Sequence, residues 1–436
     1  MNIRQIALRI LDEYEAGGKY VNLALSSHLT DGLSREDKAA LTALLYTAVE
    51  KKLSYDYYIL ALSGRSEDAI EPHTKNILRL GLCQLLDMRS IPDFAAVNET
   101  VKLAANKGEA AFVNAVLRAA SAKKDNLPMP DDKKKHTRFL SVKYSFPLAL
   151  VRHFDSLYGR EATEKILAFY NGDEYTDVTV NTLKITTDEF AKKLENQGCK
   201  VIKNNLVPSS LRIPYSVNPQ QLFGFDDGLF FVQDRASAIA VSALNVKRDS
   251  VVVDTCSAPG GKSFLAAILS ENSADIHSFD LHESKLSLIK GGAERLGIKS
   301  ISVCQRDALT PDGSLIGKAD RVICDVPCSG LGVLGKKPDL RYKDLSVLTE
   351  LPELQARILA ASAPYLKPGG RLLYSTCTLN PAENEDVVRS FVENNDGYEL
   401  VPFEVGELSA PDGMLTLLPH IHNTDGFFMA VIRKTK

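Results

Sequence analysis

Two cysteines in the second half of the sequence have neighbours that suggest nucleophilic chemistry. Cys328 lies in the segment Asp-Val-Pro-Cys-Ser-Gly at 325–330, and Cys377 lies 49 residues later in Tyr-Ser-Thr-Cys-Thr at 374–378. Each segment follows a short apolar run that is typical of a buried strand. A thiolate is a strong nucleophile that forms covalent intermediates. If the two strands are neighbours in a parallel sheet, we expect both thiols in one crevice.

Addition to a pyrimidine explains why a site would need such residues. C5 of cytosine is a poor nucleophile, but a thiolate bonded to C6 makes C5 enamine-like and able to attack an electrophilic methyl group. An acid near ring N3 would offset the developing charge, and Asp325 is the candidate if it holds a proton. A base must then remove the C5 proton so that the thiol can leave.

The loop after the first predicted strand of this half allows close approach to a ligand. Residues 254–263 have the sequence Asp-Thr-Cys-Ser-Ala-Pro-Gly-Gly-Lys-Ser and precede a predicted helix. Paired glycines admit a ligand to the backbone, and free amides at a helix start favour an anionic group. A phosphate-binding P-loop needs glycine where Cys256 stands, and the dinucleotide pattern G-x-G-x-x-G is missing. The segment alone also fits an ordinary strand-to-helix turn.

Acidic residues follow three further predicted strands. Asp280 is placed to accept the ribose hydroxyls of a nucleoside, Asp307 to accept an adenine amino group, and Asp325 ends the next strand. Each alone fits a helix cap or a solvated turn. Because ligands bind at the carboxyl ends of parallel strands, the set predicts one nucleoside-binding crevice.

Alternating strands and helices must position these residues. The pattern predicts strands at 251–253, 276–279, 301–303, 321–324 and 371–374, with helices at 264–269, 285–296 and 354–366. Such alternation favours a parallel sheet with helices on both faces. We therefore predict an α/β catalytic domain over residues 236–436.

The first half of the sequence has a different organisation. Residues 1–125 show helical periodicity with almost no strand signal, which predicts a helix bundle. Residues 123–135 have the composition of a linker, with two prolines and three consecutive lysines. Residues 138–235 mix helical segments at 147–154, 161–170 and 188–197 with strands at 178–181 and 200–202, which predicts a small α+β module.

Composition sets the class of protein. The chain has 436 residues, 44% hydrophobic and 25% charged, with a net charge of −3, which is ordinary for a globular protein of two to four domains. We find no signal-peptide pattern or membrane span and expect a cytoplasmic monomer. Seven scattered cysteines indicate a reducing compartment. We expect no metal site, and we interpret four cysteines as structural: Cys83, Cys199, Cys304 and Cys324.

Three motifs resemble those of the 5-methylcytosine RNA methyltransferases over roughly the last half of the chain. The cofactor motif of that family resembles Cys256, Ser257, Ala258, Pro259, Gly260, Gly261 and Lys262. Segment 325–330 resembles its catalytic aspartate and second-cysteine motif, and 375–378 resembles its nucleophile motif, continued by Pro-Ala-Glu-Asn-Glu at 381–385. Val326, Ser257 and Thr378 depart from the usual residues, but none of them removes a reacting atom.

This resemblance implies a role for each reacting residue. Cys377 would be the nucleophile, Cys328 would aid resolution of the covalent intermediate, and Asp325 would face N3 of the base. S-adenosyl-L-methionine would be the cofactor, bound by segment 256–262 together with Asp280, Asp307 and Asp325. The implied fold is a Rossmann-like S-adenosylmethionine-dependent methyltransferase domain.

The first half resembles the NusB family of RNA-binding proteins. The likeness lies in residues 4–25, with Tyr20 and Asn-Leu-Ala-Leu at 22–25, and in 98–104 and 112–118. An all-α NusB-like bundle, a small α+β module and this catalytic domain together are the architecture of family members that modify small-subunit ribosomal RNA. The resemblance thus implies a cytosine of 16S rRNA as substrate.

Three alternatives stay open from the sequence. A tRNA substrate is the nearest, because related enzymes share the three motifs. A non-catalytic RNA-binding factor would have no need of two thiols at adjoining strand ends. An amino-group methyltransferase would carry an aromatic residue where Cys328 stands.

Overall fold

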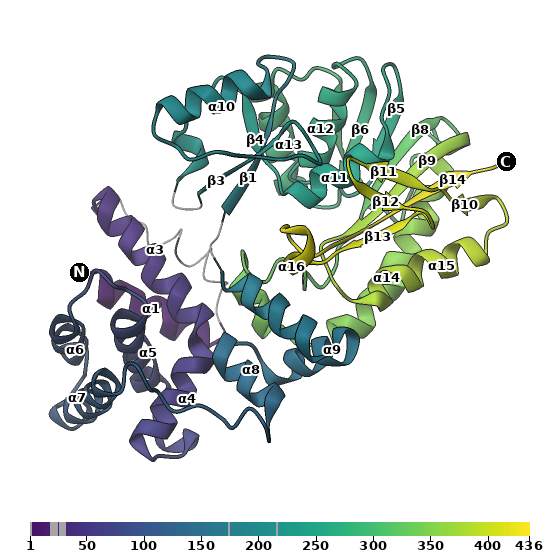
Figure 1. The fold of residues 1–436 in the computed structure, drawn as a ribbon. Coiled ribbons are helices and arrows are strands. Elements are labelled where there is room, and N and C mark those ends of the chain that lie inside the picture. Colours follow the sequence, from purple (N-terminus) through teal and green to yellow (C-terminus); the bar gives the residue numbers. More distant parts are fainter. Residues whose placement is uncertain (1, 18–24, 26–31, 173–174, 215–216) are drawn as a thin grey trace. The chain divides into compact units, whose positions relative to one another are not determined.

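The chain forms two compact units, each described by itself. The computed structural model describes residues 2–17, 25, 32–172, 175–214 and 217–436 (Figure 1). One unit comprises Met1–Asn171 with Lys337–Lys343, and the other comprises Gly172–Lys336 with Asp344–Lys436. Of the NusB-like pattern, Tyr20 and residues 22–24 lie outside the described residues. No helix in the described part of the chain is long and apolar enough to cross a membrane.

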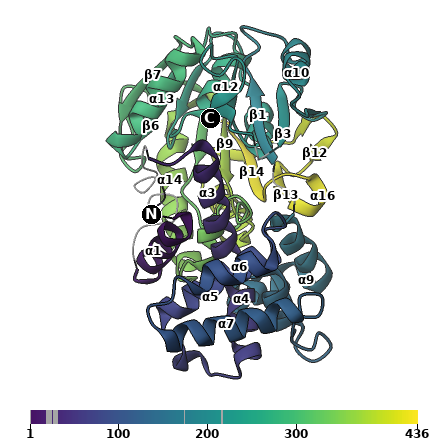
Figure 2. The ribbon, with the colours of Figure 1, turned by 90° about the vertical axis from the view of Figure 1, so that its left-hand side faces the viewer.

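The first unit is a helix bundle, as predicted. Its α-helices are α1 (Ile3–Glu15), α3 (Arg35–Glu50), α4 (Lys52–Ser63), α5 (Pro72–Leu86), α6 (Asp93–Val101), α7 (Lys107–Ala122), α8 (His136–Tyr144) and α9 (Leu148–Tyr170). Helix α5 is buried over most of its length and packs against α1, α4, α6 and α7 (Figure 2).

Helix α9 corresponds to two predicted helices. The predicted segments 147–154 and 161–170 are joined in the structure but interrupted at Gly159, where φ is 75°. Only glycine adopts that conformation without strain, so the chain kinks there. Helices α8 and α9 belong to the first unit, whereas residues 138–235 were predicted to form the α+β module.

The second unit begins with a small antiparallel sheet. Its strands are β1 (Tyr175–Val180), β2 (Ile202–Lys203), β3 (Ser210–Pro214) and β4 (Phe230–Val232), in the order β2-β3-β1-β4. Helix α10 (Thr187–Asn196) covers this sheet with Phe190 and Leu194, which are fully buried. Strands β3 and β4 were not predicted.

A larger mixed sheet carries the predicted crevice. Its strands run in the order β10-β14-β9-β8-β5-β6-β7, and β13 pairs with β14. The bounds are β5 (Val251–Asp254), β6 (Asp275–Asp280), β7 (Ile301–Gln305), β8 (Ala319–Asp325), β9 (Leu366–Thr376), β10 (Tyr398–Leu400), β13 (Met414–Leu417) and β14 (Phe427–Lys434). Strands β5 to β9 are parallel, as predicted, whereas β14 lies antiparallel beside β9.

Helices cover both faces of this sheet. Side chains alternate along each strand, so Ile323 and Leu373 face one core while Val322 and Leu372 face the other. The first core contains α11 (Arg235–Leu244), α12 (Gly261–Leu269) and α13 (Glu283–Leu296). The second contains α14 (Val347–Ser362) and α15 (Glu385–Glu393). The remaining elements are the short β11 (Phe403–Val405), β12 (Leu408–Ala410) and α16 (Pro419–His422).

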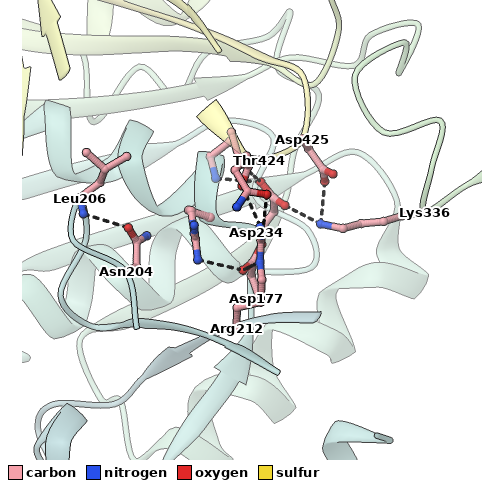
Figure 3. A network of polar contacts seen from close by, with 11 residues as sticks. Asp177, Asn204, Leu206, Arg212, Asp234, Lys336, Thr424 and Asp425 are labelled. Atoms are coloured by element: carbon pink, nitrogen blue, oxygen red, sulfur yellow. Dashed lines mark hydrogen bonds and ion pairs between the residues drawn. The ribbon is translucent and has the colours of Figure 1, made fainter. Parts of the chain in front are cut away.

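A network of buried and partly buried polar groups joins the small sheet to the large one (Figure 3). Arg212 of β3 pairs with Asp177 of β1 at 2.9 Å, and its guanidinium also donates to Asn423. Lys336 pairs with Asp234 before α11 at 2.5 Å and with Asp425 before β14 at 2.9 Å. Lys336 and Asp234 are partly exposed, and the two ion pairs of Lys336 hold the loop that ends at this residue.

Candidate active site

The structure brings the two predicted thiols together. Strands β8 and β9 are parallel neighbours, with Asp325 in register with Ser375. The chain continues three residues beyond Asp325 to Cys328 and one residue beyond Thr376 to Cys377. The sulfur atoms of the two cysteines are 3.3 Å apart, and both residues are partly accessible.

Backbone contacts hold the loops that carry these thiols. The Gly332 amide donates to the Cys377 carbonyl at 2.9 Å, and the Gly426 amide donates to the Gly332 carbonyl at 2.8 Å. The hydroxyls of Ser329 and Thr378, the residues that follow the two cysteines, are 2.7 Å apart and buried. The distance between the sulfur atoms is therefore set by the loops as well as by the strands.

Lys262 forms an ion pair beside the thiols. Its ammonium group donates to Asp325 Oδ2 at 2.7 Å, and the Ser375 hydroxyl donates to Asp325 Oδ1 at 2.6 Å. Burial acts to lower the pKa of Lys262, but the Asp325 carboxylate outweighs it and the pKa is raised. Both Asp325 oxygens thus accept hydrogen bonds, and Asp325 was predicted to act as the acid at N3 only if it holds a proton.

Two cysteines near the site, Cys328 and Cys256, lie in environments that raise their pKa. The pKa of Cys328 is raised well above its usual range by the hydrogen bond to Cys377, by burial and by the charge of Glu383. Burial likewise raises the pKa of Cys256. A thiol with a raised pKa is a poor nucleophile at neutral pH, so neither residue is activated in this arrangement.

The predicted cofactor loop runs from β5 to the start of α12. The Ser257 amide and hydroxyl both donate to the Phe279 carbonyl, each at 2.8 Å, which folds the loop against β6. Gly260 has φ of 111°, and a Cβ there would lie 2.4 Å from the ring of Phe264. The turn thus requires glycine at position 260. Because glycine has no side chain, the loop backbone there is open to a ligand.

The residues around this loop fit a nucleoside-containing cofactor. Asp280 accepts from the Ala258 amide at 3.1 Å and from the His282 amide at 3.0 Å, one on each oxygen. A carboxylate oxygen accepts more than one hydrogen bond, so both retain capacity for ribose hydroxyls. Asp307, after β7, is exposed and accepts from the Leu309 amide.

Asp254, at the end of β5, was missed as a candidate. Its Oδ2 accepts from the Ser263 hydroxyl at 2.7 Å, and its buried Oδ1 has no hydrogen-bond partner among the described residues. Burial raises the pKa of Asp254 to about 7. A buried acceptor without a donor is a fit for a donor group on a ligand. The position of Asp254 at the end of a predicted strand could have identified it as a site residue from the sequence, but it was not named as a candidate.

Two other groups at the site were also missed. Phe427 opens β14 with its ring 5.4 Å from the Lys262 ammonium, and Glu383 is a buried acid between the two thiol loops. Phe427 has no local sequence signal, whereas Glu383 lies in the quoted segment 381–385 but was given no role.

The cysteines interpreted as structural fall into two groups. Cys83 and Cys324 are buried in cores, as that interpretation requires. Cys304 is exposed on β7 and Cys199 is partly exposed, so for these two the expectation of a buried role was wrong.

Comparisons with known proteins cover the whole chain. Residues 241–433 match the family described as 16S rRNA methyltransferase RsmB/F, 1–122 match the NusB family, and 146–219 match a ferredoxin-like domain of RsmF/B-like methyltransferases. The chain is 35% identical to the "Probable ribosomal RNA small subunit methyltransferase B" of Bacillus subtilis, over 99% of both chains. A protein of the same name from Synechocystis is 35% identical over 100% of both chains.

Solved structures show the same fold. The crystal structure of PH0851 is 28% identical with a TM-score of 0.78, and the likeness covers 99% of this chain and 97% of that one. The crystal structure of NSun6 from Pyrococcus horikoshii with SFG, at 24% identity and a TM-score of 0.61, covers 67% of this chain and 99% of that chain. On its sequence, its three matched domains and its fold, the chain belongs to the 16S rRNA methyltransferase RsmB/F family.

Proposed function

We propose that this protein methylates C5 of one cytosine in 16S rRNA, with S-adenosyl-L-methionine as methyl donor and Cys377 as nucleophile. The observation that carries the proposal is the pair of thiols 3.3 Å apart beside the ion pair of Lys262 and Asp325. The names of relatives that align over the full length, which specify small-subunit ribosomal RNA, support this substrate rather than tRNA.

Cys377 attacks C6 of the flipped base. The Lys262 ammonium group lies near enough to Cys377 to interact with its charge, and this favours the thiolate. Asp325 and Lys262 together face N3 and O2 of the ring, where negative charge develops as the S–C6 bond forms. The proton needed there comes from the Lys262 ammonium group, either directly or through the Asp325 carboxylate that accepts its hydrogen bond.

Cys328 acts after the methyl group has reached C5. A base removes the C5 proton, the C5–C6 double bond re-forms, and the electrons of the C6–S bond return to Cys377. Cys328 touches the departing sulfur, which suits it to assist this step.

The residues after β5 hold the cofactor. S-adenosyl-L-methionine supplies an electrophilic methyl group on a sulfonium when it is bound. The backbone of Cys256, Ser257, Ala258, Pro259, Gly260, Gly261 and Lys262 would lie against it, Asp280 would accept from the ribose hydroxyls, and Asp307 would accept from the adenine amino group. We add Asp254 to these cofactor-binding residues, because its unpartnered Oδ1 would accept a hydrogen bond from the ligand.

We assign three parts to the chain: a NusB-like RNA-binding domain at 1–125, a substrate-binding module at 138–235 and the catalytic domain at 236–436. The cytoplasm is the compartment in which two facing thiols stay reduced. A monomer contains every residue that the proposed chemistry uses.

Substitution of the nucleophile tests the proposal. Cys377→Ala should lose 5-methylcytosine formation on 16S rRNA by at least about a thousandfold while still binding the methyl donor, because the covalent route is closed. Cys304→Ala, which changes an exposed cysteine on β7, is the matched control and should retain activity. Methylation at an ordinary rate by Cys377→Ala would refute the assignment. Mapping 5-methylcytosine in rRNA and tRNA from cells without the protein identifies the substrate.

Substitution of the second cysteine tests the later step. Cys328→Ala should form the adduct but release it slowly, so a protein–RNA species that resists denaturation accumulates. A denaturing gel after incubation with RNA and methyl donor detects it. Free protein alone in that lane, from a variant that binds RNA, would remove Cys328 from the release step.

A further inference from the structure

A buried carboxylate lies behind the two thiols. Glu383 ends the 3₁₀ turn Pro381–Glu383 that follows β9, and its side chain is fully buried. It forms none of the ion pairs found among the described residues. A buried acid without a cation is costly unless hydrogen bonds compensate for the lost water.

Hydrogen-bond donors from three segments surround this carboxylate. Its Oε1 accepts from the Ser329 hydroxyl at 2.6 Å and from the Asn380 amide at 3.1 Å. Its Oε2 accepts from the Ser329 backbone amide at 2.8 Å and from the Gln355 amide at 2.9 Å. All of these groups are donors, which is the pattern that an ionised carboxylate takes.

Two of these contacts hold the charge of Glu383 against the residue that follows Cys328. Ser329 is the residue after Cys328, so the carboxylate is held against the backbone of the Cys328 loop. The Lys262 ammonium group interacts electrostatically with Cys377, and the Glu383 carboxylate does so with Cys328. A nearby anion disfavours a thiolate and a nearby cation favours one.

We propose that Glu383 is a positioning residue that fixes the direction of the hydrogen bond between the two thiols, so that Cys328 keeps its proton and donates a hydrogen bond to the sulfur of Cys377. This inference rests on the proposed function, in which Cys377 is the nucleophile. The sulfur of Cys377 is negative before it adds to the ring and again after the C6–S bond breaks. The hydrogen bond from Cys328 stabilises both states.

The charged and titratable groups around Cys328 favour a hydrogen bond that runs from Cys328 to Cys377. Besides Cys377, the charged groups that act most strongly on Cys328 are Glu383 and Asp325, both anions, and Tyr374 of β9 also interacts with it. The Lys262 cation pairs with Asp325 and interacts with Cys377. The raised pKa of Cys328, caused first by its hydrogen bond to Cys377, points the same way.

Thiol reactivity in the protein alone tests the proposal. We would alkylate the full-length chain with iodoacetamide from about pH 6 to about pH 10 and quantify each cysteine by peptide mass spectrometry. In the unmodified protein, Cys377 should titrate first and react at least about tenfold faster than Cys328 near neutral pH, with exposed Cys304 as internal reference. If Cys328 titrates at the lower pH, the proposal is overturned without any variant.

Removal of the charge tests the role of Glu383 itself. Glu383→Gln keeps the shape of the side chain, and the reactivity of Cys328 near neutral pH should rise about tenfold. Gln355→Met removes one hydrogen bond to the carboxylate but keeps its charge, and the order of the two cysteines should stay unchanged. An unaltered Cys328 profile in folded Glu383→Gln, or an equal change in Gln355→Met, would overturn the proposal. Neither assay uses RNA or methyl donor, so the result is independent of the Cys377→Ala test.

Discussion

At the scale of single residues, Asp254 links the site to the stability of the protein. Burial raises its pKa from 3.8 to about 7, with Ser263 acting against this and Asp325 adding to it. A carboxyl group whose pKa is raised on folding stabilises the folded state when protonated. Its contribution is therefore complete below the ordinary pKa of about 4 and is lost as the pH rises to about 7.

Asp254→Asn should flatten this pH dependence, because the amide has the shape of the protonated acid and does not ionise. Between about pH 5 and about pH 7.5, the free energy of unfolding of the unmodified protein should fall by about 2 kcal/mol more than that of the variant. Urea unfolding at the two pH values measures the difference. Equal pH dependence in both proteins would mean that Asp254 is already ionised in the folded state.

The reacting residues could be predicted from sequence to different extents. Cys328 and Cys377 stand directly after strand patterns, and the rule that parallel strands present their carboxyl ends at one edge was enough to pair them. Glu383 lies in a quoted motif, but its contacts with Ser329 and Gln355 span 54 and 28 residues. No local pattern reports contacts of that kind.

At the scale of elements, the thiol loops depend on a close approach between two glycines. A Cβ on Gly332 would lie 1.7 Å from the Gly426 carbonyl oxygen and 2.8 Å from the carbonyl oxygen of Cys377. These are backbone atoms, which cannot rotate away as a side chain can. The loop after β8 and the start of β14 therefore fit together only with glycine at position 332.

Gly332→Ala should move the Cys328 loop away from Cys377 and lower the methylation rate by at least about tenfold, with a stability cost of about 1–3 kcal/mol from overpacking. Gly313→Ala is the control, because a Cβ there meets nothing within 4 Å. Methylation kinetics and thermal unfolding of both variants provide the test. Full activity in Gly332→Ala would show that the loop spacing is not critical.

The sheet itself was predictable only in its parallel part. Hydrophobic patterning located β5 to β9, since each contains a short apolar run. Strand β14 inserts antiparallel beside β9 and was missed, although it is an equally apolar run over Phe427–Lys434. Its place in the sheet depends on pairing with β9, and a sequence pattern does not show which strands pair.

At the scale of the whole molecule, the chain returns once to its first unit. The segment Lys337–Lys343, which follows the thiol loop, belongs to the helix bundle. Within it, Arg341 is 1% exposed, and its guanidinium donates to the carbonyl oxygens of Glu50 and Tyr170, both at 3.4 Å. Glu50 ends α3 and Tyr170 ends α9. A buried cation thus satisfies carbonyl groups at the ends of two helices, where the helix dipoles are negative.

Arg341→Met should destabilise the helix bundle by about 2–4 kcal/mol, because the helix ends and the Glu50 carboxylate lose their buried partner. Lys337→Met, which changes an exposed lysine of the same segment, should have little effect and is the control. Hydrogen exchange followed by mass spectrometry locates the change: faster exchange is expected near the ends of α3 and α9, with β8 and β9 unaffected. Uniform acceleration in both units would contradict this, since it would mean that the segment stabilises the molecule as a whole rather than the bundle it enters.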